Sequence, residues 1–408
     1  MRSGLVMAIA MIMLCGSAGL VEAADVQDFA AIERGHYLAD AADCGSCHTV
    51  PGSNHPFSGG RPIETPFGIL VAPNITSDRE TGIGNWTDDE FDAAVRGGRS
   101  RNGARLYPAM PFPYYSRMSR QDVMDIRAYL DTIQPVRHAV QVNRLPFPLN
   151  LRISMIAWDA LYFKPEEFHP DTSKSNDWNR GAYLTLGPGH CGACHTPKTF
   201  LGGDKPSDAL RGYTLQGWTA PGITSGQGPL ADWSMADIEV YLRTGHNRYA
   251  AAAGLMSEVV KLSTSKMTND DVKAIATYLK DTSGPAAQSS APDKNVISAG
   301  AAIYQDLCAA CHRRDGKGVP GLFPDLAETA TVKTRDPTTV LRVILQGAQS
   351  VSTGPEPTGP AMPGFGWQLN DAQIAAVATY VRDHFGKAPP VSESDARKAR
   401  SDEAARTD

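Results

Sequence analysis

The sequence has no long run of one charge sign, no long apolar stretch and little of the alternation that builds β-sheet. Lysine and arginine number 39 against 44 aspartates and glutamates, so the formal net charge is −5. Nucleic acid binds basic surfaces, and we therefore expect no nucleic-acid partner. The longest early apolar run, Leu5–Leu14, is shorter than the roughly 20 residues that span a bilayer. Small helical domains with long loops are the expected fold.

The N-terminal segment, residues 1–23, has the pattern of a secretory signal peptide. Arg2 supplies the positive start, Leu5–Leu14 the apolar run, and Val21-Glu22-Ala23 the small-residue cleavage site. An uncleaved N-terminal anchor is the alternative, weakened by the shortness of the apolar run. Cys15 lies within that run, so we expect it to leave with the signal. The mature chain would then be an exported protein with six cysteines.

Cysteine is scarce, and its arrangement is unusual for an exported protein. Six cysteines in an oxidising compartment normally indicate three disulfides. Here they form three close pairs, each separated by two residues and each followed at once by histidine. The three motifs are Cys44-x-x-Cys47-His48, Cys191-x-x-Cys194-His195 and Cys308-x-x-Cys311-His312.

A Cys-x-x-Cys-His motif is typical of covalent attachment of a c-type haem. The two thiols add to the two vinyl groups of one porphyrin, and the adjacent imidazole becomes the proximal iron ligand. A redox disulfide or half of a zinc site are the alternatives for a single pair. Zinc sites place a second pair about 15–20 residues away, whereas Cys44 and Cys191 are 147 positions apart (191 − 44). The sequence therefore predicts three covalently bound haem c groups.

The three motifs lie in three copies of one unit. Each motif follows a short helical stretch with a glycine and a tyrosine, and precedes an amphipathic helix that carries a further tyrosine. The first two units also share Pro73-Asn74-Ile75-Thr76-Ser77 and Pro221-Gly222-Ile223-Thr224-Ser225, which the third unit is expected to lack. Plausible N-caps at Thr268 and Asn370 start the last helices of units two and three.

These observations divide the chain into successive segments. We predict a signal peptide (1–23), unit one (24–133), a linker with an apolar helix at about 151–163 (134–178), unit two (179–282), a flexible linker (283–295), unit three (296–386) and a polar tail (387–408). The tail is highly charged with almost no large apolar residues, so it is expected to be frayed or disordered.

A methionine is the expected sixth ligand in each unit, because methionine sulfur is a common axial ligand in electron-transfer cytochromes. Met110 and Met362 have proline neighbours that restrict the backbone of their loops, and Met256 is the best candidate in unit two. The intervals from proximal histidine are 62 (110 − 48), 61 (256 − 195) and 50 (362 − 312). His246 is the rival ligand in unit two. The other histidines outside the motifs, His36, His138, His190 and His384, are expected to be solvated.

The ordered set of motifs resembles the three-haem cytochrome c subunits of bacterial dehydrogenases. That family serves quinohaemoprotein alcohol dehydrogenases, flavin-dependent gluconate, sorbitol and fructose dehydrogenases, and molybdenum hydroxylases such as nicotinate dehydrogenase. The resemblance extends over nearly the whole mature chain. It is carried by Gly35-His36-Tyr37-Leu38, the first two Cys-x-x-Cys-His-Thr segments, Pro73-Asn74-Ile75-Thr76, Leu106-Tyr107-Pro108-Ala109-Met110-Pro111, Leu145-Pro146-Phe147-Pro148-Leu149-Asn150 and Met362-Pro363-Gly364-Phe365-Gly366-Trp367.

The resemblance implies a mainly α fold with three tandem class I cytochrome c-like helical domains, each around one covalent haem. It implies an electron-transfer subunit with no catalytic residues, in a complex that oxidises CH-OH donors or a related small substrate. The implied partner is a quinoprotein, flavoprotein or molybdenum hydroxylase subunit, and the acceptor is quinone, a terminal oxidase or a soluble cytochrome. Relatives often carry a longer C-terminal extension for membrane attachment. The polar tail favours instead a periplasmic location, peripheral to the inner membrane.

Two other functional classes stay open on the sequence alone. One is a free-standing periplasmic electron shuttle with no dedicated dehydrogenase. The other is a haem enzyme with one open iron, for which the second haem is the best candidate because Met256 lacks proline neighbours. Likeness of fold does not choose among these classes.

Overall fold

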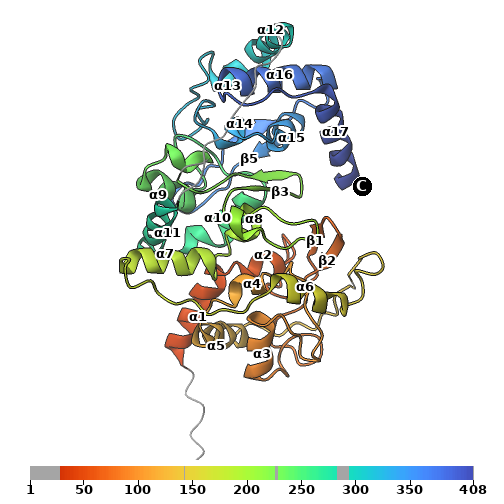
Figure 1. The fold of residues 1–408 in the computed structure, drawn as a ribbon, viewed down its shortest axis with the longest axis vertical. Helices are drawn as coiled ribbons and strands as arrows, with labels where there is room; N and C mark the ends of the chain where they lie inside the picture. The colour runs from red at the N-terminus through yellow and green to blue at the C-terminus, as the bar shows by residue number, and fades with distance from the viewer. Residues whose placement is uncertain (1–27, 142, 226–227, 283–293, 408) are drawn as a thin grey trace, which may run out of the picture.

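The computed structural model describes residues 28–407 except 142, 226–227 and 283–293. The predicted signal peptide with Cys15 and most of the predicted flexible linker therefore lie outside the described residues. The described chain is mainly helical, with six short strands in three antiparallel hairpins, which confirms the predicted fold class. Unit one, unit two and unit three follow one another along the long axis of the molecule (Figure 1).

Unit one begins and ends with long helices that cross, and a loop-rich segment with one hairpin lies between them. Its elements are α1 (Phe29–Ala41), α2 (Cys44–His48), β1 (Pro62–Thr65), β2 (Gly68–Val71), α3 (Asp88–Val95), α4 (Phe112–Tyr115) and α5 (Arg120–Asp131). In the hairpin, Pro62 pairs with Val71 and Thr65 with Gly68. Side chains of Thr87 and Ser119 cap α3 and α5, satisfying backbone N–H groups that have no partner within the helix.

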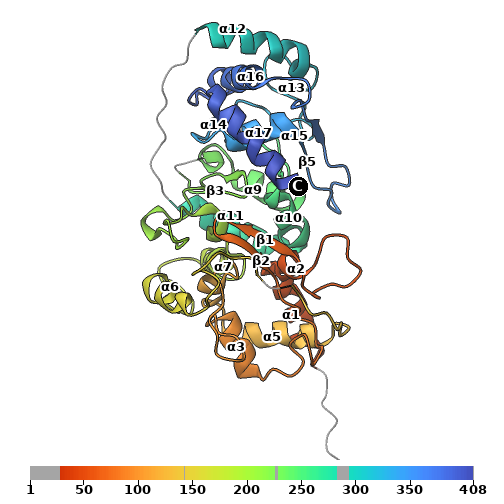
Figure 2. The ribbon, with the colours of Figure 1, turned by 90° about the vertical axis from the view of Figure 1, so that its right-hand side faces the viewer.

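The linker contains the expected apolar helix as α6 (Ser154–Tyr162). Met155 and Trp158 are buried against Phe112 of unit one, whereas Ile156 and Leu161 on the same helix are exposed. The helix therefore buries only one side of its apolar surface against the described chain. Figure 2 shows α6 at the side of unit one.

Unit two repeats the plan of unit one with additional short helices. Its elements are α7 (Asn176–Leu186), α8 (Gly192–His195), η1 (Pro206–Asp208), β3 (Tyr213–Leu215), β4 (Trp218–Ala220), η2 (Gly228–Ala231), α9 (Met235–Thr244), α10 (Leu255–Leu262), η3 (Thr264–Lys266) and α11 (Asn269–Asp281). In the hairpin, Tyr213 pairs with Ala220. The predicted cap at Thr268 is confirmed. Helix α7 starts three residues before the predicted start of the unit.

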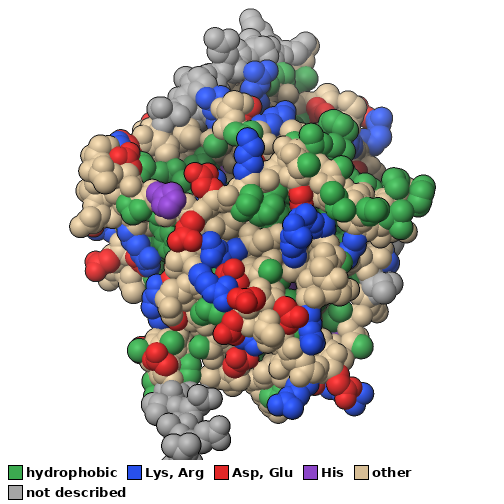
Figure 3. Space-filling view, turned by 60° about the horizontal axis from the view of Figure 1, so that its bottom comes forward, with side chains coloured by type: hydrophobic (Ala, Val, Ile, Leu, Met, Phe, Trp, Pro, Cys, Tyr) green, Lys and Arg blue, Asp and Glu red, His purple; other side chains and the backbone are tan. Residues whose placement is uncertain are grey.

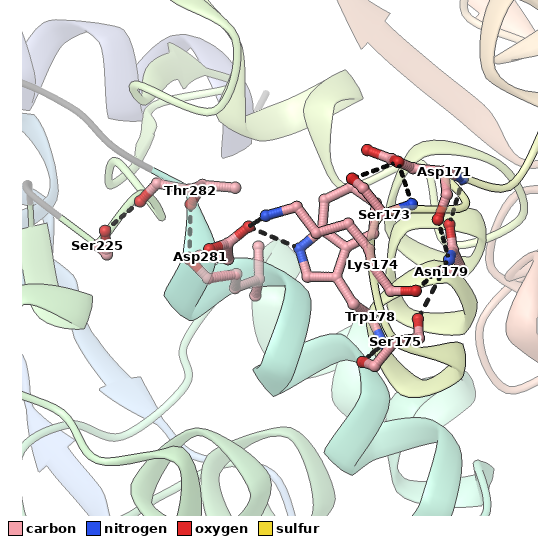
Figure 4. Close-up of polar contacts among 10 residues, drawn as sticks. Asp171, Ser173, Lys174, Ser175, Trp178, Asn179, Ser225, Asp281 and Thr282 are labelled. Carbon is pink, nitrogen blue, oxygen red and sulfur yellow. Dashed lines mark hydrogen bonds and ion pairs between the residues drawn. The ribbon is translucent and has the colours of Figure 1, made fainter.

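Polar contacts fasten the end of the linker to unit two, as Figure 4 shows. Asp281 at the end of α11 accepts hydrogen bonds from Lys174 Nζ (2.7 Å) and Trp178 Nε1 (2.9 Å). The hydrogen bond from Lys174 lowers the pKa of the Asp281 carboxyl. Asn179 binds the backbone of Asp171 in both directions. The start of α7 is thereby held against the end of α11.

Unit three has the same crossing helices and a further C-terminal helix. Its elements are α12 (Lys294–Ile303), the π-helical turn η4 (Tyr304–Cys308), α13 (Ala309–His312), α14 (Ala330–Lys333), α15 (Thr338–Gln346), β5 (Gly347–Gln349), β6 (Ala361–Pro363), α16 (Asp371–His384) and α17 (Glu393–Thr407). Gly347 pairs with Pro363 in the hairpin. The predicted cap at Asn370 is confirmed, as part of a capping box with Gln373.

The expectation of a disordered tail is wrong. Residues 393–407 form α17, which packs beside α15 and α16 (Figure 2). Val391 and Ala396 are buried in the unit-three core. Arg400 donates to Asp371 Oδ1 (2.7 Å) and to the carbonyl oxygens of Gly366 and Leu369. Small apolar residues and a long cationic side chain thus anchor a helix whose composition lacks large apolar residues.

One glycine in each unit lets the two long helices cross at very short range. A Cβ on Gly35, Gly181 or Gly300 would lie 1.8, 1.9 or 2.1 Å from a carbonyl oxygen of the facing helix, respectively that of Asp125, Ala274 or Ala376. No other residue type fits between the backbones at such distances. The three crossings also align the units with one another: Gly35, Gly181 and Gly300 occupy equivalent positions, as do Asp125, Ala274 and Ala376.

Charges of both signs are interspersed on the surface at the unit-one end of the molecule (Figure 3). Ion pairs such as Arg120 with Asp89 (2.5 Å) and Arg127 with Asp88 (3.1 Å) account for part of this mixture. None of the helices in the described part of the chain combines the length and the apolarity needed to cross a bilayer.

Candidate haem-binding sites

The three Cys-x-x-Cys-His motifs lie on the short helices that follow the first long helix of each unit. Helix α2 holds the first motif, α8 and the residue before it the second, and η4 with α13 the third. None of the six cysteines of the motifs forms a disulfide within the described residues. The residues before the first two motifs, Asp43 and His190, have positive φ (52° and 35°). This backbone bend turns the motif away from the long helix that precedes it.

A backbone carbonyl orients the histidine of the first two motifs. His48 Nδ1 lies 2.7 Å from the Pro73 carbonyl oxygen, and His195 Nδ1 lies 2.7 Å from that of Pro221. Because a carbonyl only accepts, Nδ1 carries the proton and Nε2 keeps a free lone pair. Burial lowers the pKa of both histidines, against an opposing effect of the proline carbonyls. Each imidazole is therefore neutral, and its unprotonated Nε2 can act as a ligand to iron.

His312 has a similar environment. Burial lowers its pKa, and the neighbouring Pro324 carbonyl acts in the opposite direction. The geometry falls short of a hydrogen bond, so the buried Nδ1 of His312 has no partner. A hydrogen bond from this nitrogen to the Pro324 carbonyl would leave Nε2 without a proton, as in the first two units.

The loop after each histidine repeats the same two backbone hydrogen bonds. A glycine N–H donates to the histidine carbonyl, and an Ile or Leu N–H donates to a residue with positive φ. The first set is Gly59 to His48 (2.8 Å), Gly212 to His195 (2.7 Å) and Gly318 to His312 (3.1 Å). The second set is Ile75 to Phe57 (2.9 Å), Ile223 to Leu210 (2.8 Å) and Leu326 to Gly316 (2.8 Å).

The third unit therefore has the feature that we expected it to lack. Pro324-Asp325-Leu326 takes the place of Pro73-Asn74-Ile75 and Pro221-Gly222-Ile223. It was missed because it follows its histidine by 12 residues (324 − 312), against 25 (73 − 48) and 26 (221 − 195). A search for Pro-x-Ile/Leu after the third motif, with free spacing, finds Pro324-Asp325-Leu326 but also Pro320-Gly321-Leu322, so the sequence alone does not choose between them.

The predicted methionine ligands are all partly buried. Met110 and Cys44 border the core of unit one, and Met362 and Cys308 border the core of unit three. Met362 lies in β6, opposite Ala348. In units one and three, therefore, the candidate methionine and one cysteine of the motif pack against the same hydrophobic core. Ligation of iron by these methionines stays a prediction.

Met256, at the start of α10, borders a smaller cluster that two units share. The cluster consists of Ala252 and Val260 of unit two and Val351 of unit three. Val351 also packs against Gly245, where a Cβ would lie 2.2 Å from Val351 Cγ1. A loop of unit three thus covers the Met256 side of unit two.

His246, the rival ligand of unit two, and His190, which was expected to be solvated, both lie against neighbouring units. His246 is 6 % exposed, with Nδ1 3.2 Å from the Thr244 carbonyl oxygen and Nε2 4.0 Å from Glu356 of unit three. The His190 ring packs on Tyr115 of unit one, with 5.5 Å between ring centroids. Burial lowers the pKa of His190 to about 4. The expectation of a solvated His190 is wrong, because unit one covers it.

The donor set of the motifs fits haem c. Two free thiols and one neutral imidazole with an open Nε2 lie on one short turn, and apolar side chains border it. Two thioether bonds and one nitrogen ligand to iron are what this set provides.

Comparison with known proteins agrees with this chemistry. Residues 32–134 and 297–384 match the cytochrome c family. The chain is 37 % identical to the gluconate 2-dehydrogenase cytochrome c subunit of Pantoea cypripedii, covering 93 % of this chain and 91 % of that one. It is 36 % identical to the fructose dehydrogenase cytochrome subunit of Gluconobacter japonicus, covering 90 % and 82 %. A diheme cytochrome c-type protein of Cereibacter sphaeroides is 37 % identical and covers 69 % and 98 %.

The motifs and the family together show that the chain binds haem c covalently. The chain belongs to the family of electron-transferring cytochrome c subunits that includes those of gluconate 2-dehydrogenase and fructose dehydrogenase.

Proposed function

We propose that this chain carries three haem c groups, one in each unit, and passes electrons from a catalytic dehydrogenase subunit to a terminal acceptor. The observation that supports three sites is the recurrence of one arrangement: motif, proline carbonyl beside the histidine ring, and glycine N–H on the histidine carbonyl. Each arrangement lies within its own predicted domain, 24–133, 179–282 or 296–386.

In each unit, side chains of three residue types would hold the haem. The cysteine pairs would form the thioethers, His48, His195 and His312 would each supply an imidazole nitrogen to iron, and Met110, Met256 and Met362 would each supply a thioether sulfur. When bound, haem c supplies one-electron chemistry at iron, at a potential that methionine raises. The apolar core of each unit packs against one cysteine of its motif. With a methionine bound to each iron, no substrate would reach iron, and we propose no catalytic residues in this chain.

The names of the relatives support a dehydrogenase partner. Gluconate 2-dehydrogenase and fructose dehydrogenase are named for small hydroxylated substrates, so we propose a partner that oxidises a CH-OH donor or a related small molecule. Its cofactor would be a flavin, a quinone or molybdenum. We propose quinone, a terminal oxidase or a soluble cytochrome as acceptor, and a periplasmic location at the inner-membrane surface after export.

The haem count tests the first part of the proposal. The purified chain should yield three haems per polypeptide in a pyridine haemochrome assay. Changing both Cys308 and Cys311 to alanine should lower the count to two, since each pair holds one porphyrin. A count of two in the wild type, unchanged in this variant, would refute the third site.

The sixth ligand of unit two has a matched control. Met256→Leu should remove one third of the sulfur-to-iron charge-transfer absorption, because one iron loses its thioether. Met267→Leu should leave that absorption unchanged, because Met267 is buried in the unit-two core. Equal spectra for Met256→Leu and the wild type would exclude Met256 as a ligand.

Gentle purification from native membranes tests the partner. A stoichiometric flavin-, quinone- or molybdenum-containing dehydrogenase should accompany the tagged chain. A chain that is isolated alone, from cells that contain a candidate dehydrogenase, would favour a free-standing shuttle.

A further inference from the structure

Two matching charge clusters lie where unit one meets unit two. Arg34 of α1 pairs with Asp122 and Asp125 of α5. At the corresponding position of α7, Arg180 donates to Asp271 of α11 through Nε (2.7 Å) and Nη2 (2.6 Å). Each arginine therefore holds a carboxylate of its own unit, at the start of the last long helix.

The two carboxylates are almost fully buried and fixed by their helices. Asp122 is 4 % exposed and Asp271 8 %. Their backbone N–H groups donate to the capping side chains of Ser119 and Thr268. Burial acts to raise the pKa of Asp271, but hydrogen bonds from Arg180 and Tyr37 bring it below its usual value. The carboxylate is therefore charged and held in one place.

Tyrosines cross the boundary in both directions. Tyr37 of unit one donates to Asp271 Oδ2 of unit two (2.5 Å) and accepts from Thr268 N (3.2 Å). Tyr183 of unit two donates to Asp122 of unit one. Each carboxylate thus binds an arginine from its own unit and a tyrosine from the other. The contact is therefore reciprocal between the two units.

Unit three lacks every member of this set. The glycine crossings align Arg34 and Arg180 with Ala299, and Tyr37 and Tyr183 with Ala302. The carboxylates align with Gln373, whose side chain binds the backbone N–H of Asn370 instead. The fold of a unit therefore does not require the set. It occurs only in the two units that contact each other through these helices.

The contact lies close to both haem-attachment motifs. Tyr115 of unit one donates to the Ala42 carbonyl oxygen (2.6 Å), and its ring packs on His190, the residue before Cys191. Tyr114 of unit one also lies against the second motif, because a Cβ on Gly192 would lie 2.6 Å from its Oη. The second motif therefore packs against unit one, close to the residues that precede the first motif.

We propose that Tyr37 and Tyr183 are positioning residues that lock units one and two into a single two-haem body with a fixed separation of their haem sites. The proposal rests on the proposed function, which places one haem in each unit. Electron-transfer rates fall steeply with the distance between redox centres, so a fixed separation gives one fast rate. Unit three, without the set, is joined to this body by other contacts.

The test compares the Tyr37→Phe/Tyr183→Phe double variant with Tyr304→Phe in the full-length haem-loaded protein. Tyr304 is a matched control because its hydroxyl donates only to the Arg313 carbonyl oxygen (2.7 Å) inside unit three. Pulsed electron paramagnetic resonance of the oxidised protein gives the iron–iron distances. Rapid photoreduction then gives the rate at which an electron equilibrates among the haems.

We expect the double variant to broaden the shortest iron–iron distance distribution and to slow the fastest equilibration phase. Its haem content and visible spectrum should stay those of the wild type. Loss of two hydrogen bonds to charged groups should also lower its first unfolding transition by roughly 5 °C or more. Tyr304→Phe should change neither the distance distribution nor that rate. The single Tyr37→Phe variant should show the same changes to a smaller extent.

An unchanged distance distribution and rate in the double variant, with a lower melting temperature, would overturn the positioning role and leave a contribution to stability alone. A wild type with fewer than two haems in residues 24–282 would refute the proposed function, and the positioning role with it. The haem count, measured first, distinguishes these two failures.

Discussion

Replacing Gly181 with alanine is a direct test of how unit two is held together. The new Cβ would lie 1.9 Å from the Ala274 carbonyl oxygen, 1.5 Å less than the 3.4 Å of ordinary contact. Helices α7 and α11 must separate to relieve this overlap, and Tyr278 also lies within 2.9 Å of the same Cβ. Because α7 also contributes Arg180 and Tyr183 to the boundary with unit one, the strain reaches beyond unit two.

The magnitude follows from two opposing effects. Overpacking a well-filled core costs about 1–3 kcal/mol, and the better helix propensity of alanine offsets up to about 1 kcal/mol of it. A contact of 1.9 Å with the backbone belongs at the upper end of the overpacking range, so the net loss is about 2 kcal/mol, which lowers the melting temperature of a domain of about 100 residues by roughly 8–16 °C. Gly181→Ala should therefore unfold earlier than the wild type when far-ultraviolet circular dichroism is followed with temperature.

Gly354→Ala is the control, because a Cβ there meets nothing within 4 Å and the backbone is in a region that alanine adopts readily. It should melt as the wild type does. If Gly181→Ala also melts as the wild type does, the close crossing of α7 and α11 is not a feature of the folded protein.

Two further predictions concern acid stability and the tail. His190 has a pKa lowered from 6.5 to about 4 by burial, so the folded state binds its proton less readily than the unfolded chain. Its contribution to stability is complete above about pH 6.5 and is lost as the pH falls toward 4. His190→Asn, which tolerates the positive φ, should lose less stability over that interval in denaturant titrations. Arg400→Ala should free α17 and speed proteolysis of residues 393–407, whereas Arg397→Ala, whose guanidinium is more exposed, should have a smaller effect. Equal cleavage in both variants would refute the anchoring role of Arg400.

Features that depend on local sequence were predictable. The attachment motifs are local because two thiols and an imidazole must meet one porphyrin from a single turn. The caps at Thr268 and Asn370 are local for a similar reason, since each side chain binds the backbone three residues on. The mainly helical fold followed from the periodicity of the same helices.

Features that depend on distant contacts were not predictable. The proline carbonyl that orients each histidine is recognised only when the loop has folded back, and in unit three the loop is half as long. The charged composition of residues 393–407 indicated disorder. In the structure, Arg400 of this segment binds the Asp371 carboxylate and two backbone carbonyl oxygens of unit three. The tyrosine contacts join residues 234 (271 − 37) and 61 (183 − 122) positions apart, in different units, and no pattern within one unit reveals them.

The loop that places Val351 over the Met256 side of unit two constrains the order of assembly. A ribosome releases the chain from its N-terminus, so residues 179–282 are available before residue 351 exists. Until then Ala252, Val260 and Met256 lack their contact with Val351. Unit two therefore completes this apolar cluster only after unit three has been made, and a chain that stops at the linker would leave the Met256 side of its last domain without that contact.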